Sequence, residues 1–90
     1  MMKIKNGFRM RTLGRESIIV GEGIERINFN KMIALNSSAA YLWESVEGKD
    51  FSVQDLADLL IAKYEVDPAV ALADSQKIAA DWLEVGIVEE

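Results

Sequence analysis

Carboxylates are the side chains with the widest chemical options in this sequence, because the chain contains no histidine and no cysteine. Along its predicted helices the closest pairs are Asp55 with Asp58 and Asp74 with Asp81. Two carboxylates act as general acid and base only in a pocket that separates their pKa values. These pairs fall on helix faces typical of solvated charge, so we expect no catalytic pair among them. Asp74, in the middle of its helix, is expected to hold that helix against a sheet.

The missing residue types exclude several kinds of site. Without histidine or cysteine the chain has no Ser-His-Asp triad, no cysteine nucleophile, no ordinary zinc site and no disulfide. Its six glycines form no phosphate-binding motif. Trp43, Tyr64 and Trp82 occur at helical spacing, which is more typical of a core than of a ligand cage. The sequence therefore predicts a protein that is not an enzyme, with no metal and no cofactor.

The elements that would position these residues begin with a hairpin. Strands over Phe8 to Leu13 and Glu16 to Val20 flank Gly14-Arg15, and Gly-X is the signature of a type II′ turn. This turn opposes Leu13 with Glu16 and so fixes the register. It predicts a core face and a half-polar outer face that some other part of the protein covers. The core face comprises Phe8, Met10 and Ile19, and the outer face Arg9, Arg11, Ile18 and Val20.

A second hairpin is predicted after the Gly21-Glu22-Gly23 break. Its strands are Ile27 to Phe29 and Met32 to Leu35, with Asn30-Lys31 as the turn. Asparagine suits the left-handed first position of such a turn, whereas lysine suits the second poorly. The strand at Met32 to Leu35 is therefore the better supported of the two.

Three helices are predicted in the second half of the chain. They run from Ser37 to Val46 after an Asn36 cap, from Ser52 to about Tyr64, and from Asp67-Pro68 to Val85. Apolar residues recur every three or four positions in each helix, which is the helical period. The stripes are Ala39, Leu42, Trp43 and Val46; Val53, Leu56, Leu60 and Tyr64; and Ala71, Ser75, Ile78, Trp82 and Val85.

Together these elements predict an α+β fold in a single domain over residues 1–90, with a small antiparallel three-stranded sheet followed by three α-helices. This order resembles a winged helix and makes nucleic-acid binding, or a transcription accessory role, the alternative function. Charge weighs against that alternative. Residues 1–35 hold seven basic and three acidic residues, whereas residues 36–90 hold three basic and twelve acidic ones. Acidic helices are poor partners for phosphates.

The strand at Met32 to Leu35 suggests a different kind of recognition. It is apolar, uncharged and free of proline, so nothing in it blocks pairing with an added strand. Peptides bind sheet edges in this way, with backbone pairing for affinity and side-chain pockets for specificity. Ile33→Pro would abolish such binding if the Ile33 N–H faces the incoming strand.

An ordered set of residues across nearly the whole chain resembles the coenzyme PQQ synthesis protein D family. The set comprises Lys3 to Phe8, Glu22-Gly23, Asn28 to Glu44, Gly48, Ser52, Leu56, Leu60, Tyr64 to Asp67, Asp74, Ile78, Trp82 and Gly86 to Val88. The sequence departs from the family pattern at Gly21, Asn30-Lys31, Ser75 and Ala79. These departures bear on which peptide is bound rather than on the fold.

The resemblance implies a winged-helix-like peptide-recognition domain without catalytic activity. Such a domain binds the leader of a ribosomally made, modified precursor peptide as an extra strand and presents it to a modifying enzyme. For PQQ that enzyme is a radical S-adenosylmethionine protein. Carried onto this chain, the peptide-binding residues are Lys31, Met32, Ile33, Ala34 and Leu35, with Leu72, Gln76, Ala79 and Leu83 lining the groove. Arg9 and Arg11 are expected to attract an acidic leader.

Compartment and assembly are also predicted in outline. No apolar run reaches the roughly 20 residues of a membrane span, and the basic start has no apolar region of a secretory signal. We therefore expect a cytoplasmic protein that does not bind membranes or nucleic acid. The sequence leaves open a monomer or a dimer through a sheet edge. It names neither the peptide nor the modifying enzyme nor the final product.

Overall fold

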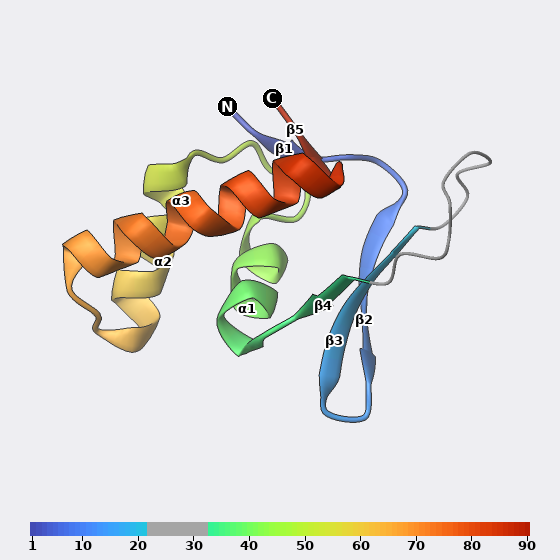
Figure 1. Ribbon diagram of the computed structural model, residues 1–90, viewed down its shortest axis with the longest axis horizontal. Coiled ribbons are helices and arrows are strands. Elements are labelled where there is room, and N and C mark those ends of the chain that lie inside the picture. Colours follow the sequence, from blue (N-terminus) through green and yellow to red (C-terminus); the bar gives the residue numbers. More distant parts are fainter. Residues whose placement is uncertain (22–32) are drawn as a thin grey trace.

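The computed structural model describes residues 1–21 and 33–90, and its elements follow the predicted order (Figure 1). In chain order they are β1 (Lys3–Ile4), β2 (Phe8–Leu13), β3 (Glu16–Gly21), β4 (Ile33–Leu35), α1 (Ser37–Val46), α2 (Val53–Tyr64), α3 (Pro68–Val85) and β5 (Val88–Glu89). The α+β class, with a three-stranded sheet before three helices, is confirmed for the described part of the chain. The predicted strand at Ile27 to Phe29, its turn at Asn30-Lys31, and Met32 lie outside the described residues.

The three-stranded sheet is antiparallel with the order β2-β3-β4. Leu13 pairs with Glu16 across the Gly14-Arg15 turn, as predicted. Gly14 has a φ of 64°, a conformation open to glycine, whereas Arg15 has no positive φ. A positive φ at the first turn position alone is the type II′ pattern. The turn residues thus set the register of the hairpin.

The two faces of the sheet differ as the register requires. Ile19 is 1% exposed and belongs to the main core, and Met10 and Ile33 pack beside it. Ile18 lies on the opposite face between its cross-strand partners Arg11 and Ala34, yet it is only 6% exposed. The outer face is therefore covered around Ile18, in agreement with its half-apolar composition.

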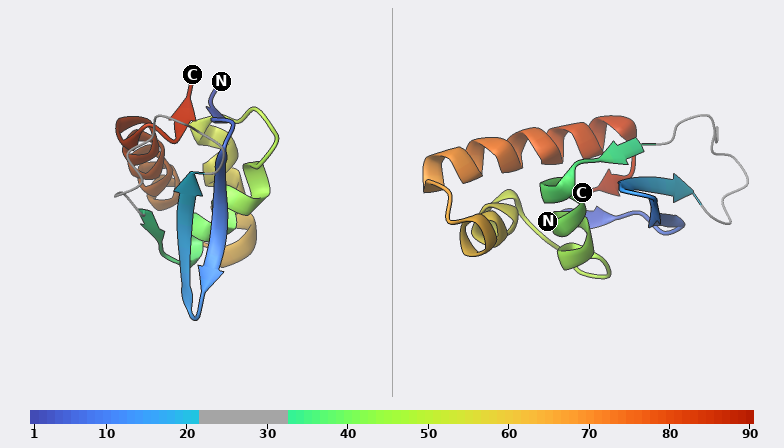
Figure 2. Two further views of the ribbon diagram at one scale, coloured as in Figure 1. Left: turned by 90° about the vertical axis from the view of Figure 1, so that its right-hand side faces the viewer. Right: turned by 90° about the horizontal axis from the view of Figure 1, so that it is seen from below.

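A second, two-stranded sheet brings the two ends of the chain together. β1 pairs antiparallel with β5, with Lys3 opposite Glu89, and these two side chains form an ion pair of 3.6 Å. The amide of Lys5 also donates to the carbonyl of Ile87 over 3.0 Å. The N- and C-termini lie side by side in Figures 1 and 2. This sheet is not among the elements predicted from the sequence.

The helix boundaries follow local capping signals. The Asn36 side chain accepts a hydrogen bond from the amide of Ala39 (2.8 Å), which satisfies a free donor of the first turn of α1. Ser52 and Asp55 exchange the two hydrogen bonds of a capping box at α2. Asp67 caps α3, and Gly86 ends it with a φ of 83°. All three starts and the end of α3 at Val85 agree with the prediction.

The core lies where the helices meet the two sheets. Trp82 makes edge-on contacts with Trp43 and Phe51, with ring centroids 5.5 and 6.3 Å apart. All three rings are buried. The predicted inner stripes were wrong at two positions: Tyr64 is 41% exposed and Val85 is 46% exposed.

Ser75 is a polar residue in this core, and it gives a test of the packing. It is fully buried on α3, and its hydroxyl has no hydrogen-bond partner among the described residues. Burying an unpaired hydroxyl costs about 1–3 kcal/mol, and alanine has the higher helix propensity. We expect Ser75→Ala to raise the free energy of unfolding by about 1 kcal/mol, measured by urea denaturation.

The matched control is Ser45→Ala. The Ser45 hydroxyl donates to the carbonyl of Tyr41 over 2.8 Å, so its removal is expected to leave the free energy of unfolding nearly unchanged or slightly lower. A clear loss of stability in Ser75→Ala would contradict the assignment of an unpaired hydroxyl, since it would mean that this hydroxyl has a buried partner.

Candidate functional site

The first part of the candidate site is the edge of β4 away from β3, with which no strand in residues 1–21 and 33–90 pairs; we call it the free edge. β4 pairs with β3 on one side, and no described strand pairs with its other side. In a two-residue hairpin the closing pair is hydrogen-bonded, so Glu16 and Ile18 direct their backbone groups to β2. Ser17 and Ile19 then direct theirs to β4, where their partners are Leu35 and Ile33. It follows that the N–H and C=O of Ala34 face the free edge.

The alternation of backbone groups along β4 shows that Ala34, and not Ile33, is the residue at which a proline tests strand addition. The Ile33 N–H was the donor that proline should remove. It is directed at Ile19 within the sheet, so Ile33→Pro would break the sheet itself. Ala34 pairs with Ile18 at a position without ladder hydrogen bonds, so it carries the outward donor and acceptor.

A groove lies beside this edge, between β4 and α3. We call it the β4–α3 groove; its volume is about 810 Å³, within the range of ligand pockets. Its lining comprises Ile33, Ala34 and Leu35 of β4; Asn36, Ser37, Ser38 and Ala39 at the start of α1; Leu60, Tyr64 and Val66 at the end of α2; and Asp74, Lys77, Ile78, Asp81, Trp82 and Val85 of α3. Figure 2 shows β4 running beside the second half of α3 in the opposite direction. The groove thus combines a strand edge with apolar side chains from the helices, which suits an extended segment.

One stripe of α3 faces this groove. Asp74, Ile78, Asp81 and Val85 are separated by four, three and four residues, the spacing of neighbours on one helix face. The stripe buried in the core, which includes Ala71, Ser75, Ala79 and Trp82, lies next to it around the helix. The helix thus presents its core stripe to the sheet and an adjacent, mixed stripe to the groove.

The predicted α3 residues lie elsewhere. Leu72, Gln76, Ala79 and Leu83 are not among the residues that line the groove. Ala79 is buried in the core, and Leu83 packs against it. Leu72 and Gln76 are exposed. Ala79 belongs to the buried stripe, and at 100° per residue Leu72, Gln76 and Leu83 lie on the side of that stripe away from the groove. The structure brings Ile33, Ala34 and Leu35 to the groove, but not these four; Lys31 and Met32 lie outside the described residues.

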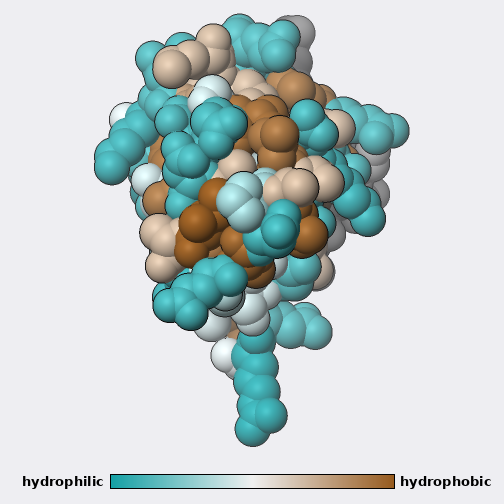
Figure 3. Space-filling model, turned by 90° about the vertical axis from the view of Figure 1, so that its left-hand side faces the viewer, coloured by the Kyte–Doolittle hydropathy of each residue, from teal (hydrophilic) through white to brown (hydrophobic). Residues whose placement is uncertain are grey.

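Leu72 belongs to a different part of the surface. Apolar side chains gather, within a hydrophilic surround, on the face that carries the connection from α2 to α3 (Figure 3). The large apolar residues exposed in this part of the chain are Tyr64, Val70 and Leu72, at 41%, 50% and 37%. Of the three, only Tyr64 lines the groove. Leu72 therefore does not contribute to the groove.

Arg9 and Arg11 are also remote from the groove. Both lie on β2, and β3 separates β2 from β4. Their side chains are on the outer face of the sheet with Ile18, opposite the face of Ile33 and Leu35. Each arginine makes an interaction of its own within the protein. A contact between these arginines and a leader would therefore involve a part of the peptide outside the groove.

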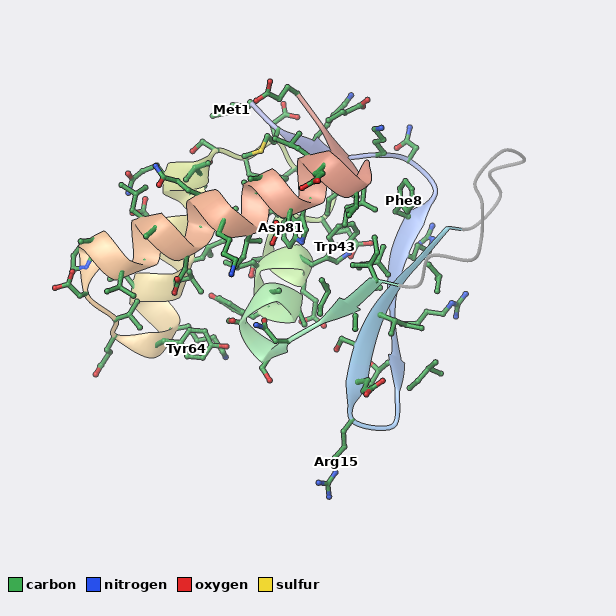
Figure 4. The ribbon with its side chains drawn as sticks, viewed as in Figure 1. Met1, Phe8, Arg15, Trp43, Tyr64 and Asp81 are labelled. Atoms are coloured by element: carbon green, nitrogen blue, oxygen red, sulfur yellow. The ribbon has the colours of Figure 1, made fainter. Side chains whose placement is uncertain are left out.

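Charge in the groove is carried by α3. Asp74 and Asp81 are exposed, and Lys77 lies between them in sequence. Among the described residues neither aspartate forms an ion pair with Lys77 within 4.0 Å, and Asp74 makes no hydrogen bond to the sheet. Figure 4 shows Asp81 on α3 and Tyr64 at the end of α2, with Arg15 pointing away at the hairpin tip. The prediction that Asp74 holds α3 against the sheet is therefore wrong, and Asp74 lies on the groove wall instead.

Tyr64 closes the groove at the end of α2. Its ring contacts that of Tyr41 edge-on at 6.1 Å, and the Lys63 ammonium lies 4.8 Å from the Tyr41 centroid. Sequence reasoning placed Tyr64 in the core and did not select Ile78, Asp81 or Val85 as groove residues. The spacing of four, three and four residues from Asp74 to Val85 shows that these side chains share one helix face. It does not show that this face lines a groove, because a stripe in a core has the same period.

Two further observations concern metal sites and membrane-spanning helices in the described residues. In residues 1–21 and 33–90, no group of three or more histidine, cysteine, aspartate or glutamate side chains is placed to hold a metal ion. None of the described helices is both long and apolar enough for a transmembrane span. What the site offers is backbone pairing, an apolar floor and a charged wall.

Comparison with known proteins gives two matches. The model of the family "Coenzyme PQQ synthesis protein D (PqqD)" matches residues 13–88. The solved structure "TbiB1 in Complex with the TbiA(beta) Leader Peptide" is similar over 97% of this chain and 94% of that chain, with a TM-score of 0.74 and 15% sequence identity. No curated protein matches the chain. At this identity the structural likeness concerns the fold.

Proposed function

The chain belongs to the coenzyme PQQ synthesis protein D family, and from this membership we propose that it binds the leader of a ribosomally made precursor peptide and delivers it to a modifying enzyme. The solved protein of the same fold is in complex with a leader peptide. The proposed role here is non-catalytic, because binding and presentation need only an edge, a groove and a surface for the enzyme.

One observation carries this proposal: the outward backbone groups of Ala34 lie beside the β4–α3 groove. A peptide strand that pairs with Ala34 would place alternate side chains on the face of Ile33 and Leu35, toward α3. Backbone hydrogen bonds would supply affinity, and the groove would select side chains. The groove is apolar at Leu60, Ile78 and Trp82, so binding would also remove apolar surface from water.

The finer parts of the proposal concern the partners. We propose a radical S-adenosylmethionine protein as the modifying enzyme, as the family's role in PQQ synthesis implies, and the cytoplasm as the compartment. The free edge of β4 is also suited to pairing with a second copy of the chain, which would give a dimer that competes with the peptide. Sedimentation with and without bound peptide tests this, and a dimer that dissociates as peptide binds is the expected result if the edge is shared.

The alternative, nucleic-acid binding, is less well supported. The exposed side of α3 carries Asp74, Asp81 and Glu84 against Lys77, so this helix would meet phosphates with mainly negative charge. Phosphate contacts dominate affinity for DNA. The acidic surface thus favours the peptide over the duplex.

An amide NMR titration tests the proposed function. The ¹⁵N-labelled protein is titrated with peptides encoded near its gene, and with a duplex DNA as control. We expect peptide-induced shifts at residues 33–39 and along Asp74, Ile78, Asp81 and Val85, with no response to DNA. If the peptide bound against the α3 residues predicted from the sequence, the amide signals of Leu72, Gln76 and Leu83 would shift instead. Shifts with DNA and none with any peptide would favour the alternative function.

A further inference from the structure

The α3 wall of the groove combines charge and apolar surface in a regular order. Asp74 precedes Ile78 by four residues, and Asp81 precedes Val85 by four, so each carboxylate is followed one turn later by an apolar side chain on the same stripe. Four residues of helix rise about 6 Å. Side chains on one face of a strand recur every two residues, at about 6.6–6.8 Å. A strand along α3 therefore meets a carboxylate and an apolar residue at successive inward positions.

The free charges on this wall are mainly negative. Asp74 and Asp81 are both exposed and, among the described residues, both lack an ion-pair partner. Lys77 lies on the same wall, but its long stem lets the ammonium turn toward water, whereas the short aspartates stay where the helix holds them. A cationic side chain is the complement to such a wall, and a peptide strand that covers it reduces screening by water.

Direction follows from the arrangement of the elements. β4 and α3 run in opposite directions in two views (Figures 1 and 2). All the described pairings of the three-stranded sheet are antiparallel. A peptide that continues this pattern on β4 would run parallel to α3, and its residues would meet a carboxylate first and the apolar neighbour second.

Building on the proposed function, we propose that the groove selects a leader in which a lysine or arginine precedes an apolar residue by two positions. The basic side chain contacts Asp74 or Asp81, and the apolar one contacts Ile78 or Val85. This requirement concerns the segment in the groove and is separate from the acidic segment proposed for Arg9 and Arg11. It gives the class of peptide: a short, cationic, amphipathic strand.

A selection from random sequences tests this specificity. A library of random twelve-residue peptides displayed on phage is panned against the wild-type protein at low salt. We expect the selected peptides to be enriched in the pattern basic-x-apolar. Synthetic copies with the lysine replaced by glutamate should bind about tenfold more weakly, and the difference should shrink at high salt, as for a pair of exposed charges.

Three variants assign the effect to the groove wall. The double variant Asp74→Asn, Asp81→Asn should lose the discrimination between lysine and glutamate, and Lys77→Gln should increase it. Glu84→Gln is the matched control, because Glu84 is exposed on α3 but does not line the groove. It should leave the discrimination unchanged. All four side chains are exposed, so circular dichroism should show the same fold in each variant.

The outcomes separate this inference from the function on which it rests. If no sequence is enriched on the wild type, both fail. If peptides are enriched and shift residues 33–39, but without a basic preference, the peptide-binding function stands and the specificity is overturned. Lysine preference that persists in the double aspartate variant also overturns it, because the charge would then come from elsewhere. Enrichment of basic-x-apolar that disappears in the double variant supports both.

Discussion

Leader binding by the Ala34→Pro variant is expected to be about ten- to a hundredfold weaker than binding by the wild type. The Ala34 N–H faces the free edge of β4, so proline removes the donor offered to the peptide without removing a hydrogen bond from the sheet. A peptide carbonyl left without its donor in a covered groove costs about 1–3 kcal/mol. Isothermal titration calorimetry with a peptide identified by the NMR titration measures the effect.

Two matched variants make this result specific. Ala34→Val keeps the donor and the strand propensity, so its affinity should stay within a few-fold of the wild type. Ile33→Pro removes a donor directed at Ile19, so it should lower the midpoint of thermal unfolding, which Ala34→Pro should largely preserve. A folded Ala34→Pro protein with unchanged affinity would falsify binding by strand addition.

Replacing Trp82 with alanine is expected to lower the free energy of unfolding by about 3–5 kcal/mol. Trp82 is 3% exposed and packs edge-on against both Trp43 and Phe51. A domain of this length has a total stability of about 5–13 kcal/mol, so the variant would keep only part of it. Urea unfolding followed by circular dichroism measures the loss.

The same substitution bears on binding, because Trp82 also lines the groove. Trp82→Phe should lose less stability, since an aromatic ring remains, and Val85→Ala should lose little because Val85 is 46% exposed. If Trp82→Ala unfolds at nearly the wild-type urea concentration, the buried aromatic cluster does not hold α3 against α1 as described.

The parts of the fold that follow from short-range signals could be predicted from the sequence. Gly14-Arg15 specifies a turn with one residue at positive φ, and this sets the pairing of Leu13 with Glu16. Asn36, Ser52 and Asp67 cap their helices by bonds within three residues. In each case the residue that specifies the turn or the helix start lies within a few positions of it in the sequence.

The groove wall could not be predicted in the same way. Helical periodicity shows that α3 has apolar stripes, but it does not show which stripe meets the core. In the structure Ser75 and Ala79 belong to the stripe that meets the core, and Leu72 and Gln76 are exposed on the side of α3 away from the groove. The β1–β5 sheet was missed because two-residue strands are too short to show a period.

The contact between the two indoles has a practical consequence. Trp43 and Trp82 are the only tryptophans of the chain, and their rings lie 5.5 Å apart at an interplanar angle of 84°. One of them borders the groove and the other lies behind it. A ligand that settles on Trp82 changes the polarity around this indole and therefore the combined tryptophan emission of the protein. The protein thus carries its own optical reporter, and occupancy of the groove can be followed by intrinsic fluorescence without any label.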